Sequence, residues 1–367
     1  MLKEGDEMLT KRQTLILKAI IDAYSASGEP VGSKTLLGLT GTEASSATIR
    51  NEMVRLEKQG LIAKMHSSSG RVPTEAGYRY YINFIMPEYG GAIDSGLSTE
   101  DSRRVQEVFQ VPYLALGEIV NRSTSLLAEL TNYVAIALGP SAREFHLAGF
   151  RLVPIASHQV MAILVTEEGV VENQIFRLPV SIEEEDLEQM VRLINRELVG
   201  CDLTTVMTKL RTDFFHYLNE SVQQLIGQGS MMEYLLNKVN TQRVYVQGKN
   251  NLYHYLYESD DIDQIDYLNQ LLSNPDQMNQ MLTPSEQGIQ VKIGRDLSIE
   301  GLDHLSVMTA QLEGPSAHQT ISVAILGPEN MSYLRMAQLF QGVRVELCHY
   351  IDSYYHCEEG KMNGKNR

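Results

Sequence analysis

Helix-breaking glycine and proline residues divide the N-terminal part of this chain into short helical segments. Their spacing constrains the fold more than any other feature of the sequence. Thr10 with Gln13 forms a capping box ahead of apolar residues at helical spacing, which predicts a first helix. Second and third helices are expected at 33–37 and 46–59. The breaks that separate the helices stand at Gly28, Pro30, Gly32, Gly38, Gly41 and Gly60. Three helices this close together predict a compact module.

A short hairpin is expected directly after the third helix. Leu61, Ala63 and Met65 alternate with Ile62, Lys64 and His66 in a short strand, a serine-rich turn follows at 67–70, and residues 71–72 form the return strand. Pro73 and Thr74 then open a further helix. Three helices followed by a hairpin is the order of a winged helix-turn-helix, whose recognition helix enters the major groove of DNA.

The charge of the chain is spread unevenly. Its net charge of −15 is unfavourable for a partner as acidic as DNA. Residues 8–86, however, contain ten Lys and Arg against six Asp and Glu, so this part carries +4 and the remainder must carry −19. With this distribution, the basic N-terminal part (the head) can bind DNA phosphates, while the acidic remainder (the body) is repelled by them.

The predicted third helix divides into two faces when its residues are placed at about 100° intervals. Ile49, Met53 and Leu56 share one face, which we expect to lie in the core. Side chains that read base edges and phosphates gather on the other half and beside it. The predicted DNA-binding residues of this helix are Ser46, Thr48, Arg50, Asn51, Arg55 and Lys58. A solvated helix face would look similar, but its place third in the module favours DNA binding.

Three basic residues bracket the tip of the predicted hairpin. Lys64, His66 and Arg71 lie around the serine-rich turn, where a basic side chain can reach the DNA backbone or a neighbouring groove. A hairpin can equally be plain surface, and a lone histidine is more often structural than a ligand. Their place beside the third helix puts all three in the predicted DNA-binding set.

The body of the chain alternates helices and strands, which predicts an α/β architecture. Strands are expected at 133–138, 147–153, 159–165, 243–247, 289–293, 305–312 and 320–326. A long helical stretch, opened by a capping box at Ser181 and Glu184, separates the first group of strands from the second. This middle part is interpreted as an insertion within one sheet domain, with a separate middle domain as the other interpretation.

Several runs at fixed spacing resemble the signature of the HrcA family of heat-inducible transcription repressors. In the head these runs are Ser46–Asn51, Met53, Leu56–Glu57, Gly60–Ile62, His66–Arg71, Pro73–Thr74 and Gly77–Tyr80. A weaker similarity continues to about Arg344, notably in Arg243–Gly248 and Ile325–Pro328. The wing departs mildly, because Ser67 and Ser69 stand where Thr and Ala are usual.

The resemblance implies an α+β chain in which a winged helix-turn-helix precedes a GAF-like α/β sheet domain, itself interrupted by a mostly helical dimerisation insert. The predicted parts are a winged-helix domain at 1–88, a linker at 89–97, a GAF-like domain at 98–180 and 243–345, an insert at 181–242 and a disordered tail at 346–367. The resemblance also implies a homodimer that represses chaperone operons by binding the inverted-repeat CIRCE element in double-stranded DNA. It further implies that the GroE chaperonin maintains the active form.

Other functional classes find less support in the residues. The chain contains no phosphate-binding loop, dinucleotide fingerprint or hydrolase motif, so we expect no enzyme and no cofactor. Cys348 and His349 with His356 and Cys357 match no common zinc spacing, and we predict no metal site. With three cysteines, an acidic start and no run of about 20 apolar residues, we expect a cytoplasmic protein without a membrane partner.

Two rival interpretations remain at this point. One is a winged-helix regulator controlled by a small ligand bound in the GAF-like domain. The other is an interaction module that uses its wing for contact with another protein.

Overall fold

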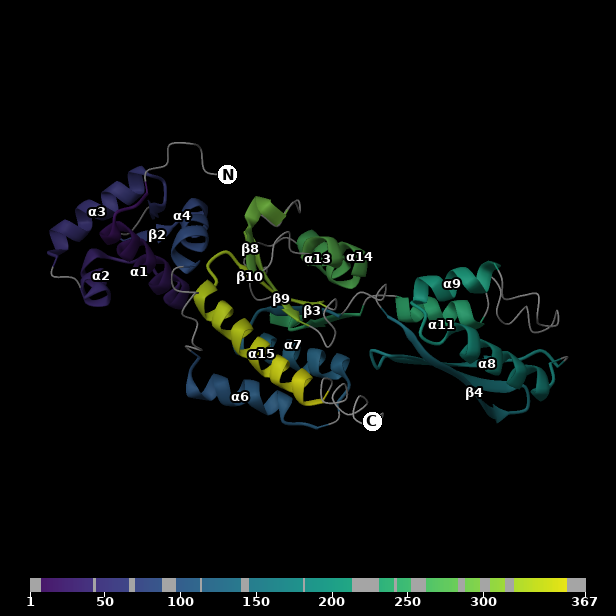
Figure 1. Cartoon of the computed structure of the whole chain (residues 1–367). Helices are drawn as coiled ribbons and strands as arrows, with labels where there is room; N and C mark the ends of the chain where they lie inside the picture. Colours follow the sequence, from purple (N-terminus) through teal and green to yellow (C-terminus); the bar gives the residue numbers. More distant parts are fainter. Residues whose placement is uncertain are drawn as a thin grey trace.

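The computed structural model describes residues 8–41, 44–65, 70–87, 97–112, 114–139, 145–180, 182–212, 231–240, 243–251, 262–282, 288–297, 304–313 and 320–354. Three bodies follow one another in it (Figure 1): a helical head, a central sheet with helices on both faces, and a second sheet with helices of its own. The protein is therefore of mixed α and β class, as the sequence predicts.

The head begins with three short helices and a two-stranded hairpin. Its elements are α1 (Lys11–Ser27), α2 (Ser33–Thr40), α3 (Ser46–Lys58), β1 (Ile62–Lys64) and β2 (Arg71–Pro73). The predicted capping box of α1 is present, because the Thr10 hydroxyl accepts from the Gln13 amide and the Gln13 side chain accepts from the Thr10 amide. α1 and α2 each end at a glycine with positive φ, Gly28 and Gly41. This is the element order expected of a winged helix.

A fourth helix leads from the head toward the sheet domain. α4 (Glu75–Tyr80) begins at the N-cap Thr74 and continues as a π-helical segment, Tyr81–Ile85. Gly77 allows this helix to lie against the start of the hairpin, because a Cβ atom at that position would collide with the Leu61 carbonyl. The start of α4 therefore packs closely against the hairpin of the head.

The central domain is built on an antiparallel sheet with the strand order β7-β3-β10-β9-β8. Its strands are β3 (Val134–Leu138), β7 (Val244–Gln247), β8 (Ile289–Ile293), β9 (Leu305–Glu313) and β10 (Thr320–Pro328). One face packs against α6 (Thr99–Phe109), α7 (Leu116–Thr131) and α15 (Tyr333–Tyr354), and the other against α13 (Ile262–Ser273) and α14 (Pro275–Leu282). Every residue of β3 is buried, because helices cover both faces of the sheet.

A third body is inserted between β3 and β7. Its elements are β4 (Leu147–Ala156), β5 (Gln159–Thr166), β6 (Val171–Arg177), α8 (Glu184–Leu198), α9 (Leu203–Thr212) and α11 (Met231–Asn240). The strands form a sheet of their own in the order β4-β5-β6, and one face of it packs on the helices through Phe150, Ala162 and Leu164. Along β5, buried residues alternate with half-buried ones, so these helices cover only one face.

Two of the predicted boundaries are wrong. The strands at 147–153 and 159–165 were expected in the central sheet, but the structure pairs them with each other and with β6 inside the insert. An alternating pattern identifies a strand without identifying its partner, because sheet pairing is set by distant contacts. The tail predicted from residue 346 is wrong as far as Tyr354, because α15 continues to that residue and buries Leu347 and Tyr350. Residues 355–367 lie outside the described part of the chain.

Candidate DNA-binding surface

The predicted recognition helix, α3, begins at a side-chain cap. Ser45 is the N-cap, and its hydroxyl accepts from the Thr48 amide at 3.2 Å. Arg55 and Lys58 lie in the last turn, where positive charge is favourable beside the negative end of the helix dipole. The local sequence therefore fixes both where this helix starts and how it ends.

The two faces of α3 are those that the sequence predicts. Ile49, Met53 and Leu56 are buried at 3% exposure or less. Four members of the predicted DNA-binding set are exposed, namely Asn51, Arg55 and Lys58 on the opposite half and Arg50 at its flank. The structure thus presents three cations and one amide together on the outer face of a single helix.

Ser46 and Thr48 are less available than the other predicted residues. Both are half-buried, and their hydroxyls already have partners within the head. The Ser46 hydroxyl lies 3.1 Å from that of Ser33 at the start of α2, and the Thr48 hydroxyl lies 3.0 Å from that of the N-cap, Ser45. These two residues fix the start of α3 against its surroundings.

Glu52 is a polar residue of α3 that does not belong to the predicted DNA-binding set. It is only 8% exposed, and its carboxylate has two partners. The Gln13 amide nitrogen donates to Oε2 at 3.1 Å, and Arg55 Nη1 donates to Oε1 at 3.0 Å. The spacing of Glu52 and Arg55 at i and i+3 indicates their pairing, whereas the contact with Gln13 requires the tertiary fold.

The three predicted wing residues differ in their surroundings. Lys64 is exposed at the end of β1, and His66 lies outside the described residues. Arg71 is held inside the head, because its Nη2 and Nε donate to Glu57 Oε2 at 2.8 and 3.1 Å and its side chain is 13% exposed. Its backbone also pairs with Val31. In this structure Arg71 ties the wing to the end of α3.

Three further exposed cations lie at helix starts in the head. Lys11 and Arg12 open α1, and Lys34 is the second residue of α2, whose N-cap Gly32 supplies no side chain. In helix-turn-helix proteins the first helix of the motif crosses the DNA backbone, where uncapped amides and a cation suit phosphate. A lysine two residues after a capping glycine is the pattern that would have identified Lys34.

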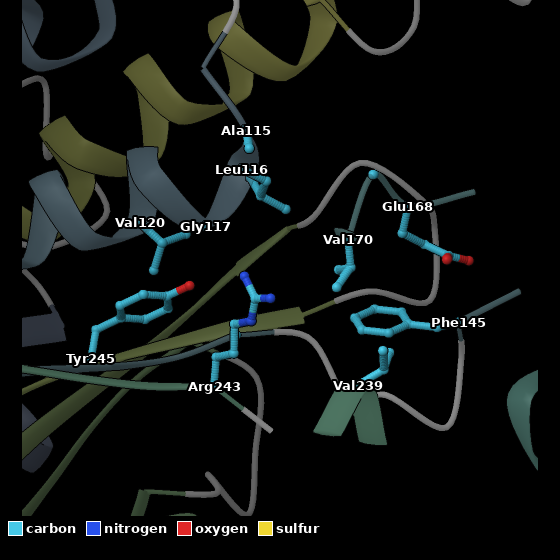
Figure 2. A pocket seen from close by; sticks show the side chains of 12 residues that line it. Ala115, Leu116, Gly117, Val120, Phe145, Glu168, Val170, Val239, Arg243 and Tyr245 are labelled. Carbon is cyan, nitrogen blue, oxygen red and sulfur yellow. The ribbon is translucent and has the colours of Figure 1, made fainter. Parts of the chain in front are cut away.

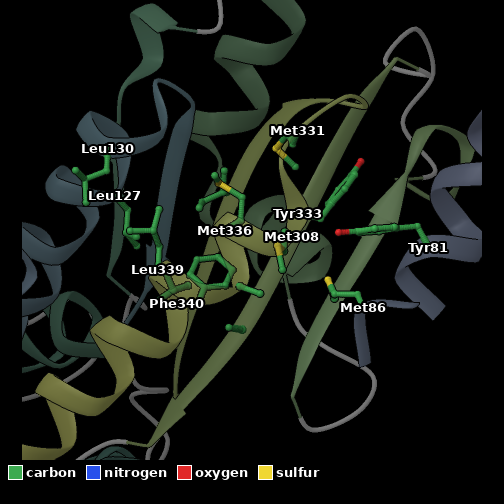
Figure 3. Packing of buried hydrophobic residues seen from close by; sticks show 14 of the residues in the cluster. Tyr81, Met86, Leu127, Leu130, Met308, Met331, Tyr333, Met336, Leu339 and Phe340 are labelled. Carbon is green, nitrogen blue, oxygen red and sulfur yellow. The ribbon is translucent and has the colours of Figure 1, made fainter. Parts of the chain in front are cut away.

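The head is attached to the central domain by a continuous apolar contact. Figure 3 shows Tyr81 and Met86 of the head lying beside Tyr333 and Met308 of the sheet domain. The rings of Tyr78 and Tyr333 meet edge to face with their centroids 5.8 Å apart. Two polar contacts flank these side chains and fix the direction of the head. They are an ion pair between Arg79 and Asp296 and a 3.3 Å hydrogen bond from Ser25 Oγ to the Met331 carbonyl.

A small cavity lies between the central domain and the insert (Figure 2). Phe145, Val170 and Val239 line it from the insert, while Arg243 and Tyr245 line it from the start of β7. Its volume is about 60 Å³. This holds a few water molecules and is far below the roughly 300–1,000 Å³ of ordinary ligand pockets.

The part of the chain that the structure describes was compared with the requirements of a metal site and of a membrane-spanning helix. No three His, Cys, Asp or Glu side chains within that part lie close enough together to hold a metal ion. Cys348 and His349 lie on α15, whereas His356 and Cys357 fall outside the described residues. Among the described helices, none has the length and apolarity needed to cross a membrane.

The element order of the head and the polar outer face of α3 are those of the winged-helix class, whose members typically bind DNA. Residues 117–337 match the family model described as HrcA protein C terminal domain. The heat-inducible transcription repressors HrcA of Enterococcus faecalis and Ligilactobacillus salivarius are 38% and 40% identical to this chain, and each alignment covers 95% of it and 99% of the relative. This chain therefore belongs to the HrcA family of heat-inducible transcription repressors.

One solved structure resembles the whole chain. It is described as the crystal structure of a hypothetical protein at 2.2 Å resolution, and it matches with a TM-score of 0.66 at 24% identity. The match covers 94% of this chain and 99% of that one. The arrangement of head, central sheet and insert is thus shared with a protein of quite different sequence.

Proposed function

We propose that this repressor binds an inverted-repeat operator of the CIRCE type as a homodimer and thereby blocks transcription of chaperone operons. The observation that carries the proposal is the outer face of α3, where Arg50, Asn51, Arg55 and Lys58 are exposed together. An α-helix fits the major groove of B-form DNA, and the family relationship supplies the kind of operator.

The residues of the head divide into two roles in this proposal. Asn51 and Arg55 are the base readers, because an amide pairs with adenine and a guanidinium with guanine through two hydrogen bonds each. Lys58 and Lys64, with Lys34 at the start of α2, contact phosphates and set the register of the head on the duplex. Arg71 supports the wing through Glu57 rather than contacting DNA itself.

The proposal is tested by substituting the base readers. Asn51→Ala or Arg55→Ala should weaken operator binding by about 1–3 kcal/mol and relax base preference, whereas Lys64→Ala should weaken binding to all duplexes alike. The measurement is a fluorescence anisotropy titration with the operator and with a scrambled duplex at the same salt concentration. Arg192→Ala is the matched control, because this arginine is also exposed on a helix and paired with a glutamate, but lies in the insert. Unchanged operator preference in both reader variants would contradict the assignment.

The insert offers the surface on which two copies would meet. On the face of its sheet that the described helices leave open, Val153 pairs with Met161 and Met161 with Ile175, which places three apolar side chains in one row. Val153 and Ile175 are 39% and 54% exposed. An apolar sheet face of this kind suits a two-fold contact with the same face of a second copy.

A charge on that face tests the homodimer. Ile175→Asp should convert the protein to a monomer in sedimentation velocity, because a carboxylate would be buried between two apolar faces. Val199→Asp is the matched control, since Val199 is 41% exposed but follows α8 on the helical side of the insert. A dimer that persists in Ile175→Asp and dissociates in Val199→Asp would move the interface to the helical side.

The family relationship also supports regulation through the GroE chaperonin. In this proposal the active dimer is only marginally stable, so a modest rise in temperature populates inactive forms that the chaperonin refolds. Operator binding should therefore fall after mild heating and recover with chaperonin and ATP. Binding that survives heating and gains nothing from the chaperonin would remove this part of the proposal.

The described residues give little support to control by a small ligand, although one pocket of about 300 Å³, lined by Ile289, Leu312 and Phe340, lies beside β8 and β9. The face of the central sheet under α13 and α14 is filled by apolar side chains, including Ile136, Leu268 and Met278. The cavity beside the insert is too small for an ordinary metabolite (Figure 2). A thermal-shift screen separates the two models, because a specific ligand raises the melting temperature by mass action.

A further inference from the structure

Arg55 is the base reader with the most conformational freedom to lose. Its side chain is 65% exposed at the end of α3, and a free arginine samples many rotamers. Binding a guanine through two parallel hydrogen bonds requires one orientation of the planar guanidinium. A contact that holds the side chain in that orientation before DNA arrives raises the affinity for the correct base.

Glu52 supplies such a contact. Its Oε1 accepts from a single guanidinium nitrogen of Arg55, Nη1, at 3.0 Å. Because a guanidinium has five N–H groups, donors remain for a base edge after this bond is made. The Glu52 side chain is itself only 10% exposed, so it offers a fixed anchor on the helix rather than a mobile surface partner.

Gln13 fixes the other side of the Glu52 carboxylate. Its amide nitrogen donates to Glu52 Oε2 at 3.1 Å, and its amide oxygen accepts from the Thr10 amide at 3.0 Å. Gln13 is 7% exposed and belongs to α1, the helix that packs behind α3. A chain of hydrogen bonds therefore runs from the N-cap of α1, through Gln13 and Glu52, to the guanidinium at the DNA-facing surface.

We propose that Gln13 and Glu52 are positioning residues that hold Arg55 in its base-reading orientation, so that sequence preference is set in part from α1, behind the recognition helix. This inference rests on the proposed function, because it assigns Arg55 to a base. A buried carboxylate without its partners is costly, so this pair also contributes to the stability of the head. Stability and base preference are separate quantities, and the test measures both.

The test uses the full chain and two nearly isosteric substitutions, Gln13→Met and Glu52→Gln. The quantity measured is the ratio of the affinity for the operator to the affinity for a scrambled duplex of the same length at the same salt concentration. Each variant should lower this ratio about tenfold, a loss within the roughly 5- to 150-fold expected for Arg55→Ala. Gln13→Met keeps the charge of the head and should leave the affinity for the scrambled duplex unchanged, whereas Glu52→Gln removes a negative charge and should raise that affinity. Tyr81→Phe is the matched control, because it removes another hydrogen bond to α1, the one to Asp22, without touching α3.

A double-mutant cycle distinguishes positioning from simple stabilisation. The ratio for Gln13→Met combined with Arg55→Ala should equal that for Arg55→Ala alone, because a positioning residue has nothing left to position. Gln13→Met and Glu52→Gln that lower the melting temperature but keep the wild-type ratio would overturn the inference while leaving the reading face intact. A wild-type protein with no operator preference would instead contradict the proposed function.

Discussion

The central domain is joined to its two neighbours in different ways. The head shares one apolar cluster with it, which runs from α1 through Tyr78 and Tyr333 to α15. Figure 3 shows the part of this cluster around Tyr333. The insert has an apolar cluster of its own, and a cavity lies at its junction with the central domain (Figure 2). Arg243 and Glu172 form an ion pair across this second junction.

This difference indicates which parts of the molecule move together. A shared apolar core makes two bodies cooperative, because neither can open without exposing the side chains of the other. Two bodies connected by chain crossings and ion pairs can unfold or reorient separately. We therefore expect the head and the central domain to behave as one unit and the insert as another. In a dimer paired through the inserts, the spacing of the two heads would be set at the insert junction.

The largest effect should come from matched cavities in the two cores. Tyr78→Ala and Phe150→Ala each remove a large ring that is at most 3% exposed, at an expected loss of about 3–5 kcal/mol in the free energy of unfolding. Tyr78→Ala should lower the amide protection of the head and of β3 and β10 together, whereas Phe150→Ala should lower that of the insert alone. Hydrogen exchange measured by segment provides the comparison. Unchanged protection of the central sheet in Tyr78→Ala would show that the head is a separate unit.

A smaller effect should distinguish the ion pairs at the two junctions. Glu172 is 12% exposed and pairs with both Lys238 and Arg243, so Glu172→Gln should cost about 1–3 kcal/mol. Asp296 is 41% exposed and pairs with Arg79 beside a large apolar contact, so Asp296→Asn should cost less than about 1 kcal/mol. Urea unfolding of both variants measures the difference. Equal costs would contradict the view that charge matters more at the insert junction.

The smallest effect is a pH dependence confined to the insert. The hydrogen bond with Glu168 raises the pKa of His146 above 6.5, against an opposing effect of burial, and the charges of Glu167 and Asp202 add to the rise. Because the folded pKa is the higher one, this stabilisation is complete below about pH 6.5 and is lost as the pH rises through the folded pKa. The melting temperature of the insert should fall over that interval, and Glu168→Gln should flatten the slope. An equal slope in that variant would assign the pH dependence to other groups.

Local patterns predicted the head well because its elements are set by near neighbours. The capping box at Thr10 and Gln13, the glycine ends of α1 and α2 and the two faces of α3 all depend on residues a few positions apart. Two strands of the insert, β4 and β5, were recognised but assigned to the wrong sheet, since alternation carries no information about which strand lies alongside. The third, β6, was not predicted.

The candidate site was predicted in part for the same reason. The exposed residues of α3 follow from helical periodicity, which requires only the helix itself. The pairing of Arg71 with Glu57 and the contact of Gln13 with Glu52 join residues 14 and 39 positions apart. Such contacts exist only once the helices have packed. For this reason the sequence alone indicated neither the ion pair of Arg71 nor the buried contact of Glu52.

Removal of the insert tests the central claim most directly, which is that two reading heads act together because the inserts pair. Leu138 of β3 and Val244 of β7 are partners in neighbouring strands, and the Gly139 amide donates to the Arg243 carbonyl at 2.9 Å. A two-residue Asn-Gly turn can therefore replace residues 140–242 and leave a β-hairpin.

The measurement is the affinity of the intact and the shortened chain for the full inverted repeat and for a half-site. The account predicts that both proteins bind the half-site alike, and that only the intact chain gains about 100-fold or more on the full repeat. A shortened chain that binds the full repeat as tightly as the intact chain would contradict it.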